Sequence, residues 1–234
     1  MSQHTNQYGQ PVGQPLDWQE RPYPQREIFI GQSCRLEPFS VATHADALFE
    51  AYSLAEDGRD WTYMFVGPFT HKQAWLERAV QMESSRDPLH FAVIDLQTER
   101  AVGSLALMRI EPQHGVIEVG HVAFSPLLKQ TRMATEAHYL LMRYAFEQLG
   151  YRRYEWKCDS CNAPSRRAAA RLGFRYEGEF RQAIVYKGRT RDTCWFSIID
   201  GEWPQVKSGF ERWLHSENFT PQGEQREKLE ALRR

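Results

Sequence analysis

The strand-like run over 116–124 carries two side chains that could accept a proton, Glu118 and His121. A carboxylate among Val and Phe side chains is desolvated, which raises its pKa and suits a general base working near neutrality. Histidine, with an ordinary pKa of about 6.5, is a rival base. The structural alternatives are a carboxylate paired with an arginine and a histidine with purely structural contacts. Strict alternation puts Glu118 and His121 on opposite faces, but a bulge would break that parity. The sequence therefore leaves the base open between them.

The segment that follows, 125–136, leads from this strand into a helix. A helix start exposes unpaired N–H groups and the positive end of the helix dipole, so it can bind an anion such as a pyrophosphate. The small residues Ala134 and Thr135 would allow close approach, and Lys129 and Arg132 add positive charge. A capped helix without a ligand is the alternative interpretation. The segment is thus a candidate phosphate site.

A second helix start follows at Asn162, where Asn162-Ala163-Pro164-Ser165 precedes an Arg171-Leu172-Gly173-Phe174 ending. Asn162 is well suited to cap the helix. Ser165, three residues later, can hydrogen-bond the helix start. The local sequence therefore indicates a capped helix start.

These motifs, in this order and spacing, resemble the GNAT superfamily of acetyltransferases, and specifically its RimJ/RimL type, over about Cys34 to Trp203. The family's Q/R-x-x-G-x-G/A pyrophosphate motif falls on 129–134, where Lys129 replaces Gln or Arg and Arg132 replaces Gly. We expect the Arg132 guanidinium to neutralise phosphate charge. Ser165 matches the proposed general acid of the RimJ/RimL type, whereas Ala169 stands where other members have a Tyr. The resemblance implies acetyl-CoA as co-substrate, bound by Val122, Ala123, Phe124, Lys129, Gln130, Thr131, Arg132, Met133, Ala134, Thr135, Asn162 and Ser165.

The elements that must position these residues follow from hydrophobic periodicity and turn residues. Three strand-like runs with short connections, 90–96, 101–110 and 116–124, indicate an antiparallel meander. A helical pattern up to Gly150 then leads to a strand at 152–157, which makes that strand a parallel crossover partner. The resemblance implies a GNAT α/β fold, with a mixed, mostly antiparallel sheet, helices on both faces and a splayed parallel strand pair at the cofactor. We expect a flexible tail over 1–25, the acetyltransferase domain over 26–204 and a helical extension over 205–234, with helices at 205–217 and 224–234.

An aromatic segment from Trp61 to Phe69 is the candidate acceptor surface, with Trp61, Tyr63 and Glu118 as substrate-binding residues. The neighbouring acids Glu56, Asp57 and Asp60 would attract a cationic amine, such as a protein N-terminus or a small molecule. Core packing of Trp61 and Tyr63 is the structural alternative.

Composition limits the other roles. Lys plus Arg (29) nearly equals Asp plus Glu (30), so we expect no nucleic-acid partner, and no apolar run approaches the roughly 20 residues of a membrane span. Four scattered cysteines indicate a reducing, cytoplasmic setting, and the lone C-x-x-C at Cys158 and Cys161 lacks the second ligand pair of a zinc site. A non-catalytic acyl-CoA sensor and a transferase of a larger acyl group, such as succinyl, are alternative functions. The apolar face of Phe210, Trp213 and Leu214 could serve a homodimer interface.

Overall fold

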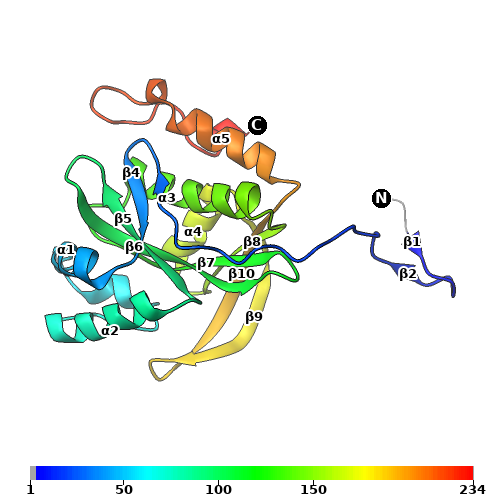
Figure 1. Cartoon of the computed structure of the whole chain (residues 1–234), viewed down its shortest axis with the longest axis horizontal. Coiled ribbons are helices and arrows are strands. Elements are labelled where there is room, and N and C mark those ends of the chain that lie inside the picture. The colour runs from blue at the N-terminus through cyan, green and yellow to red at the C-terminus, as the bar shows by residue number, and fades with distance from the viewer. Residues whose placement is uncertain (1–3, 234) are drawn as a thin grey trace.

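An eight-stranded sheet organises the chain, whose computed structural model describes residues 4–233. Its strand order is β3-β4-β5-β6-β7-β8-β10-β9, and neighbours are antiparallel except for the parallel pair β7 and β8. This α/β arrangement confirms the fold class predicted from the sequence (Figure 1). The strands are β3 (Phe29–Ile30), β4 (Cys34–Pro38), β5 (Leu89–Asp95), β6 (Arg100–Glu111), β7 (Val116–Phe124), β8 (Arg153–Asp159), β9 (Arg175–Tyr186) and β10 (Arg189–Ile199).

Helices cover both faces of the sheet because the central strands are apolar on both sides. In β5, Phe91 and Val93 face one core cluster, and Ala92 and Ile94 face the other. Helices α1 (Val41–Ser53) and α2 (Lys72–Ser84) close the second cluster, together with the short helix η1 (Gly58–Trp61) between them. The opposite face carries α3 (Arg132–Arg143) with its π-helical continuation η2 (Tyr144–Gln148), α4 (Ala163–Leu172) and α5 (Trp203–Leu214). None of the helices in the described part of the chain is long and apolar enough to cross a membrane.

A buried carboxylate fixes α3 to the edge of the sheet. Glu136 accepts hydrogen bonds from the backbone N–H groups of Gln32 (2.6 Å), Ser33 (2.8 Å) and Cys34 (3.1 Å) in the β3–β4 turn. Gly31 is required beside it, since an added Cβ would lie 2.5 Å from Glu136 Cδ. The helix that borders the candidate phosphate site therefore has a fixed position on the sheet.

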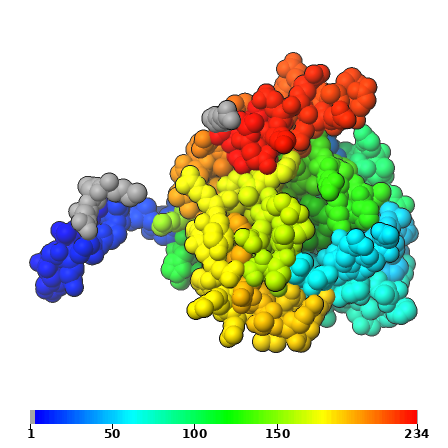
Figure 2. Space-filling view, turned by 180° about the vertical axis from the view of Figure 1, so that it is seen from behind, coloured from blue at the N-terminus to red at the C-terminus, as the bar shows by residue number. Residues whose placement is uncertain are grey.

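The N-terminal segment divides into two parts. Strands β1 (His4–Thr5) and β2 (Pro11–Val12) form a small hairpin that projects from the body (Figures 1 and 2). Residues 18–26 instead lie on the body: Trp18 Nε1 donates to the carbonyl of Gln113 (2.6 Å), and the Gln25 N–H donates to the Tyr144 hydroxyl (2.8 Å). Of the two forms that the sequence allows for residues 1–25, a flexible tail or an arm draped over the body, the second describes residues 18–25, because the Trp18 indole packs on the turn at Gly115.

The C-terminal extension is helical only in its first half. Helix α5 begins two residues before the first expected helix (205–217) and ends three residues before its end, and short turns, η3 (Ser216–Asn218) and η4 (Ala231–Arg233), follow. The expected helix over 224–234 is wrong: residues 224–230 are not helical, and of the described residues only Ala231–Arg233 (η4) form a short helical turn. The backbone groups of Glu227 hydrogen-bond a side chain in place of helical partners. Asn218 Oδ1 accepts from the Glu227 N–H (2.9 Å), and Asn218 Nδ2 donates to the Glu227 carbonyl (3.2 Å).

The apolar face of α5 packs inside the chain. Phe210, Trp213 and Leu214 are buried in the same core as α3, and Tyr139 stacks on Phe210 with ring centroids 5.5 Å apart. The end of the chain covers α4, where Arg233 Nη2 donates to the carbonyl of Ala170 (3.2 Å; Figure 2). This face is therefore not the exposed dimer surface that we considered from the sequence, because the chain's own α3 occupies it.

We predict that Phe210→Ala lowers the free energy of unfolding by about 3–5 kcal/mol, since the ring is fully buried and its removal leaves a cavity. Chemical denaturation followed by circular dichroism measures the change. The exposed Gln205 on the same helix provides the control, because Gln205→Ala should change stability by less than about 0.5 kcal/mol. A small loss of stability accompanied by a change in oligomeric state would contradict the intramolecular role.

Candidate functional site

Two neighbouring strands separate at the centre of the sheet. The parallel pairing of β7 with β8 runs from Val116 opposite Arg153 to Val119 opposite Trp156, and stops there. A bulge lies just beyond, between the pairs Gly120–Ala106 and Ala123–Ser104, and His121 has a φ of 47°. The bulge breaks strand alternation. Backbone groups of 120–124 that face β8 are consequently free of strand pairing and can hydrogen-bond a ligand.

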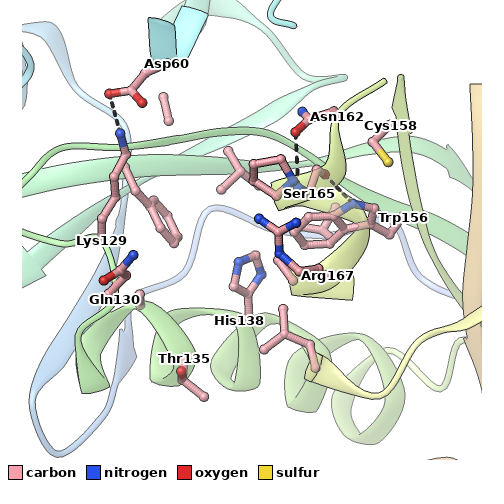
Figure 3. A pocket seen from close by; sticks show the side chains of 18 of the residues that line it. Asp60, Lys129, Gln130, Thr135, His138, Trp156, Cys158, Asn162, Ser165 and Arg167 are labelled. Carbon is pink, nitrogen blue, oxygen red and sulfur yellow. Dashed lines mark hydrogen bonds and ion pairs between the residues drawn. The ribbon is translucent and has the colours of Figure 1, made fainter. Parts of the chain in front are cut away.

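A cavity of about 900 Å³ opens at this separation. It extends between the strand ends, α3, α4, the aromatic segment and the C-terminal extension (Figure 3). Met133 does not line it, because its side chain packs against the core. All the other residues proposed from the sequence do line it: Trp61, Tyr63, Glu118, His121, Val122, Ala123, Phe124, Lys129, Gln130, Thr131, Arg132, Ala134, Thr135, Asn162 and Ser165.

The start of α3 forms one wall of the cavity. Thr131 caps the helix, its Oγ1 accepting from the Ala134 N–H (3.2 Å), and Gln130 precedes it with a φ of 61°. Arg167 and Arg171 line the same cavity from α4, and Arg171 donates to Thr135 Oγ1 (3.0 Å). This wall combines helix N–H groups with cationic side chains, a combination that favours an anion.

Arg132 lines the cavity and also contacts the C-terminal extension, while its role in neutralising phosphate stays a prediction. Its guanidinium donates to the carbonyl of Leu214 and to Gln32 Oε1 (2.6 Å), and it lies 4.8 Å from the ring centroid of Phe219. Phe219 also lines the cavity. Arg132 therefore joins the C-terminal extension to the start of α3.

Asn162 and Ser165 are positioned by the start of α4. Asn162 Oδ1 caps the helix by accepting from the Ser165 N–H (3.1 Å), while Ser165 Oγ accepts from Trp156 Nε1 (3.0 Å; Figure 3). Since the indole N–H can only donate, this bond does not use the hydroxyl proton of Ser165, whose side chain also hydrogen-bonds the Cys158 thiol.

Glu118 is buried, with 7 % of its side chain exposed, and borders the cavity. Burial raises the pKa of its carboxyl, and this effect exceeds the opposing influence of the Lys157 ammonium 2.7 Å away. Lys157 is shared with Glu155 (2.6 Å), and Arg109 lies 3.4 Å from Glu118. The carboxyl thus combines the desolvation expected from the sequence with the ion pairing that we considered as the alternative.

His121 differs from Glu118 in its surroundings. Its ring lies against His90 (centroids 5.2 Å apart), and burial lowers its pKa to about 4. A histidine with this pKa is neutral near pH 7 but binds a proton weakly. The geometry therefore favours Glu118 over His121 as a base.

His138 is a cavity residue that we did not propose from the sequence. It lies between Phe124 and Trp156, with ring centroids 5.5 and 5.3 Å away, and burial lowers its pKa to about 3 (Figure 3). It follows Ala134 and Thr135 by one helical turn. That spacing places it on the same face of α3 and could have identified it.

The aromatic segment forms the other end of the cavity. Trp61 is buried and packs edge-on against Tyr52 (5.4 Å) and Phe69 (5.2 Å), and the Tyr63 hydroxyl donates to the carbonyl of Cys161 (3.1 Å). The nearby acids have partners within the chain. Asp60 pairs with Lys129 across the cavity (Figure 3), and Asp57 pairs with Arg59. The acidic surface that we expected to attract an amine is therefore largely neutralised.

Cys158 and Cys161 are free thiols, the first buried and the second exposed. Within residues 4–233, no group of three or more His, Cys, Asp or Glu side chains is arranged to hold a metal ion.

Comparisons with known proteins agree with this geometry. The model of the acetyltransferase (GNAT) domain family matches residues 34–175. The crystal structure of a GCN5-related N-acetyltransferase from Brucella melitensis is 46 % identical, covers 93 % of this chain and 98 % of its own, and superposes with a TM-score of 0.91. A probable acetyltransferase of the GNAT family from Chromobacterium violaceum ATCC 12472 is 39 % identical over 82 % of this chain and 97 % of its own, with a TM-score of 0.77. The uncharacterized N-acetyltransferase YnaD of Bacillus subtilis (strain 168) is 26 % identical over 65 % of this chain and 87 % of its own.

We predict that Arg132→Gln speeds hydrogen exchange in residues 215–228, because the guanidinium bonds that hold this segment to α3 are lost. Hydrogen–deuterium exchange with mass spectrometry measures the effect. Lys129→Gln, at the same helix start but paired with Asp60, should leave exchange in 215–228 as in the wild type. Equal exchange in wild type and Arg132→Gln would show that other contacts suffice.

Proposed function

Because the chain belongs to the acetyltransferase (GNAT) domain family, we propose that it transfers an acetyl group from acetyl-CoA to a primary amine. The observation that carries the proposal is the separation of β7 from β8 over a cavity with a cationic wall at α3 and α4 and a buried carboxyl on β7. We further propose direct transfer, with both substrates bound at once, since the cavity is continuous from the start of α3 to the aromatic segment.

The residues around the cavity fit acetyl-CoA. A pantetheine arm is a chain of amides, and the free backbone groups of 120–124 are suited to hydrogen-bond it. A pyrophosphate suits the start of α3 with Arg167 and Arg171 nearby. When bound, acetyl-CoA supplies an acyl group activated as a thioester.

Glu118 acts as the general base and Ser165 as the general acid. An amine must be uncharged to attack a carbonyl carbon, and Glu118, buried with a raised pKa, accepts its proton directly or through one water. The new bond joins nitrogen to the acyl carbon, and the bond from that carbon to sulfur breaks. Ser165, whose oxygen already accepts from Trp156, has its hydroxyl proton to give to the departing thiolate.

The acceptor proposed from the sequence is a protein N-terminus or a small-molecule amine, as in the RimJ/RimL type. The support is the match of the Asn162–Ser165 and Arg171–Phe174 motifs to that type. The structure adds a cavity end bounded by Trp61, Tyr63 and Phe65, where such an amine would enter.

We predict amine-dependent release of CoA from acetyl-CoA, measured with a thiol reagent across a panel of amines and peptides. Ser165→Ala should lower kcat by about 100-fold or more, the usual contribution of a positioned acid, with little change in the KM for acetyl-CoA.

Trp156→Phe is the matched variant, since it removes the indole N–H that orients Ser165 but keeps the hydroxyl, and it should have the smaller effect. Binding of acetyl-CoA without transfer to any amine would instead indicate an acyl-CoA sensor. Faster release from succinyl-CoA would indicate a larger acyl donor. An unchanged kcat in Ser165→Ala would remove Ser165 from the mechanism.

We predict that kcat/KM falls as pH drops through the raised pKa of Glu118, because only the ionised carboxyl can accept a proton. Glu118→Gln should remove this acidic limb and reduce the rate at neutral pH. Glu155→Gln provides the control, since Glu155 contacts the same Lys157 ammonium but does not line the cavity, and should keep the limb. A pH profile of Glu118→Gln that matches the wild type would assign the base elsewhere.

A further inference from the structure

One cation at the acceptor end of the cavity lacks an anionic partner. Arg191, on β10, is buried, with 7 % of the residue exposed, and it lines the cavity. Its Nε donates to Thr193 Oγ1 (3.1 Å), and the guanidinium lies 5.5 Å from the ring centroid of Phe65. It forms no ion pair with any carboxylate among residues 4–233.

Two acidic residues lie close to Arg191 in the sheet, Asp159 opposite Thr193 and Asp192 next in sequence, and both accept hydrogen bonds from neutral groups. Asp159 Oδ2 accepts from the Tyr186 hydroxyl (2.7 Å), and Asp159 Oδ1 accepts from the Cys161 N–H (2.8 Å). Asp192, next in sequence, accepts from the Gln182 N–H (2.6 Å) in the bulge of β9. These bonds hold both carboxylates in place, and neither of them forms an ion pair with Arg191.

Two other cations near this end of the cavity, Lys157 in its lining and Lys187 outside it, are held by the chain. Lys157 lies between Glu118 and Glu155. Lys187 donates to the carbonyls of Trp61 (2.7 Å) and Gly67 (3.0 Å), and so ties the β9–β10 hairpin to the aromatic segment. Arg191 therefore differs from its neighbours in presenting unused guanidinium donors to the cavity.

A buried charge without a partner is costly, and a guanidinium presents a planar fork that matches a carboxylate. We infer that Arg191 binds a carboxylate of the acyl acceptor, so that the acceptor is an amine that also carries a carboxylate, as an amino acid or an acidic peptide does. This inference rests on the proposed acetyl transfer, and it narrows the acceptor from any primary amine to one class.

The test compares acceptors in pairs that differ only in charge: free amino acids and their α-carboxamides, and short peptides with Asp or Glu against the same peptides with Asn or Gln. With acetyl-CoA, we expect the wild type to prefer the carboxylate member of at least one set by about 10- to 100-fold in kcat/KM, the range of a charged hydrogen bond. Arg191→Gln should abolish that preference, and Arg191→Lys should retain part of it. Arg189→Gln, on the same hairpin but exposed, should behave as the wild type.

Equal use of both members of every pair by the wild type would overturn the inference while leaving the proposed acetyl transfer intact. A raised KM for acetyl-CoA in Arg191→Gln with unchanged acceptor preference would assign Arg191 to the donor and also overturn it. A preference for succinyl-CoA over acetyl-CoA that Arg191→Gln removes would also overturn the inference, because the carboxylate bound by Arg191 would then belong to the acyl group.

Binding of the acetylated product to the wild-type protein gives a second test, which needs neither turnover nor a substituted protein. In the presence of CoA, N-acetylated amino acids should raise the melting temperature of the wild type more than their amides do. If no amine is acetylated, the proposed function fails. The difference in melting temperature between N-acetylated amino acids and their amides then tests the carboxylate site at Arg191 by itself. The absence of any such difference would overturn the carboxylate site.

Discussion

The end of pairing between β7 and β8 is the constraint on which the rest of the site depends. Parallel strands that stayed paired beyond Val119 and Trp156 would satisfy each other's backbone groups and leave no space between them. The bulge at His121 changes the direction of β7 at this point, and α3 and α4 begin directly after the two separated strands. Helix starts, free backbone groups and the buried Glu118 consequently meet in one cavity.

Both lysines that line the cavity are paired within the chain, whereas its arginines form no ion pair with any described residue, and this determines which charges can act on a substrate. Lys129 pairs with Asp60, and Lys157 is shared by Glu118 and Glu155. The ammonium beside Glu118 opposes the rise in pKa that burial causes, yet the pKa remains raised, so the carboxyl keeps the character of a base. Histidines in the same region are driven to the neutral form by burial, which limits His121 to a weak base and His138 to a packing or hydrogen-bonding role.

Most elements could be predicted from the sequence because their signals are local. The apolar runs of β5, β6 and β7 and the helical spacing of α3 and α4 give bounds close to those in the structure. The predicted phosphate-binding start of α3 and the Asn162–Ser165 motif come together for the same reason, since each lies directly after a strand. The contacts that the sequence could not show are those between residues distant along the chain. Arg132 bonds to Leu214, Asp60 pairs with Lys129, and Asn218 takes the backbone bonds that a second C-terminal helix would have used. No periodicity or spacing reports such contacts.

Arg132 illustrates how a substitution within a motif can be explained by residues outside it. The family model ends at residue 175, yet the cavity is also lined by Trp213, Phe219, Gly223 and Gln225 of the C-terminal extension. A glycine at position 132 would leave the start of α3 open but could not hold this extension. Arginine can, because its guanidinium reaches the Leu214 carbonyl and the Phe219 ring at the same time. Arg132, one of the two residues that depart from the family motif, thus joins the extension to the shared fold. The cationic end of the cavity gains an aromatic wall, Trp213 and Phe219, that the matched region alone does not supply.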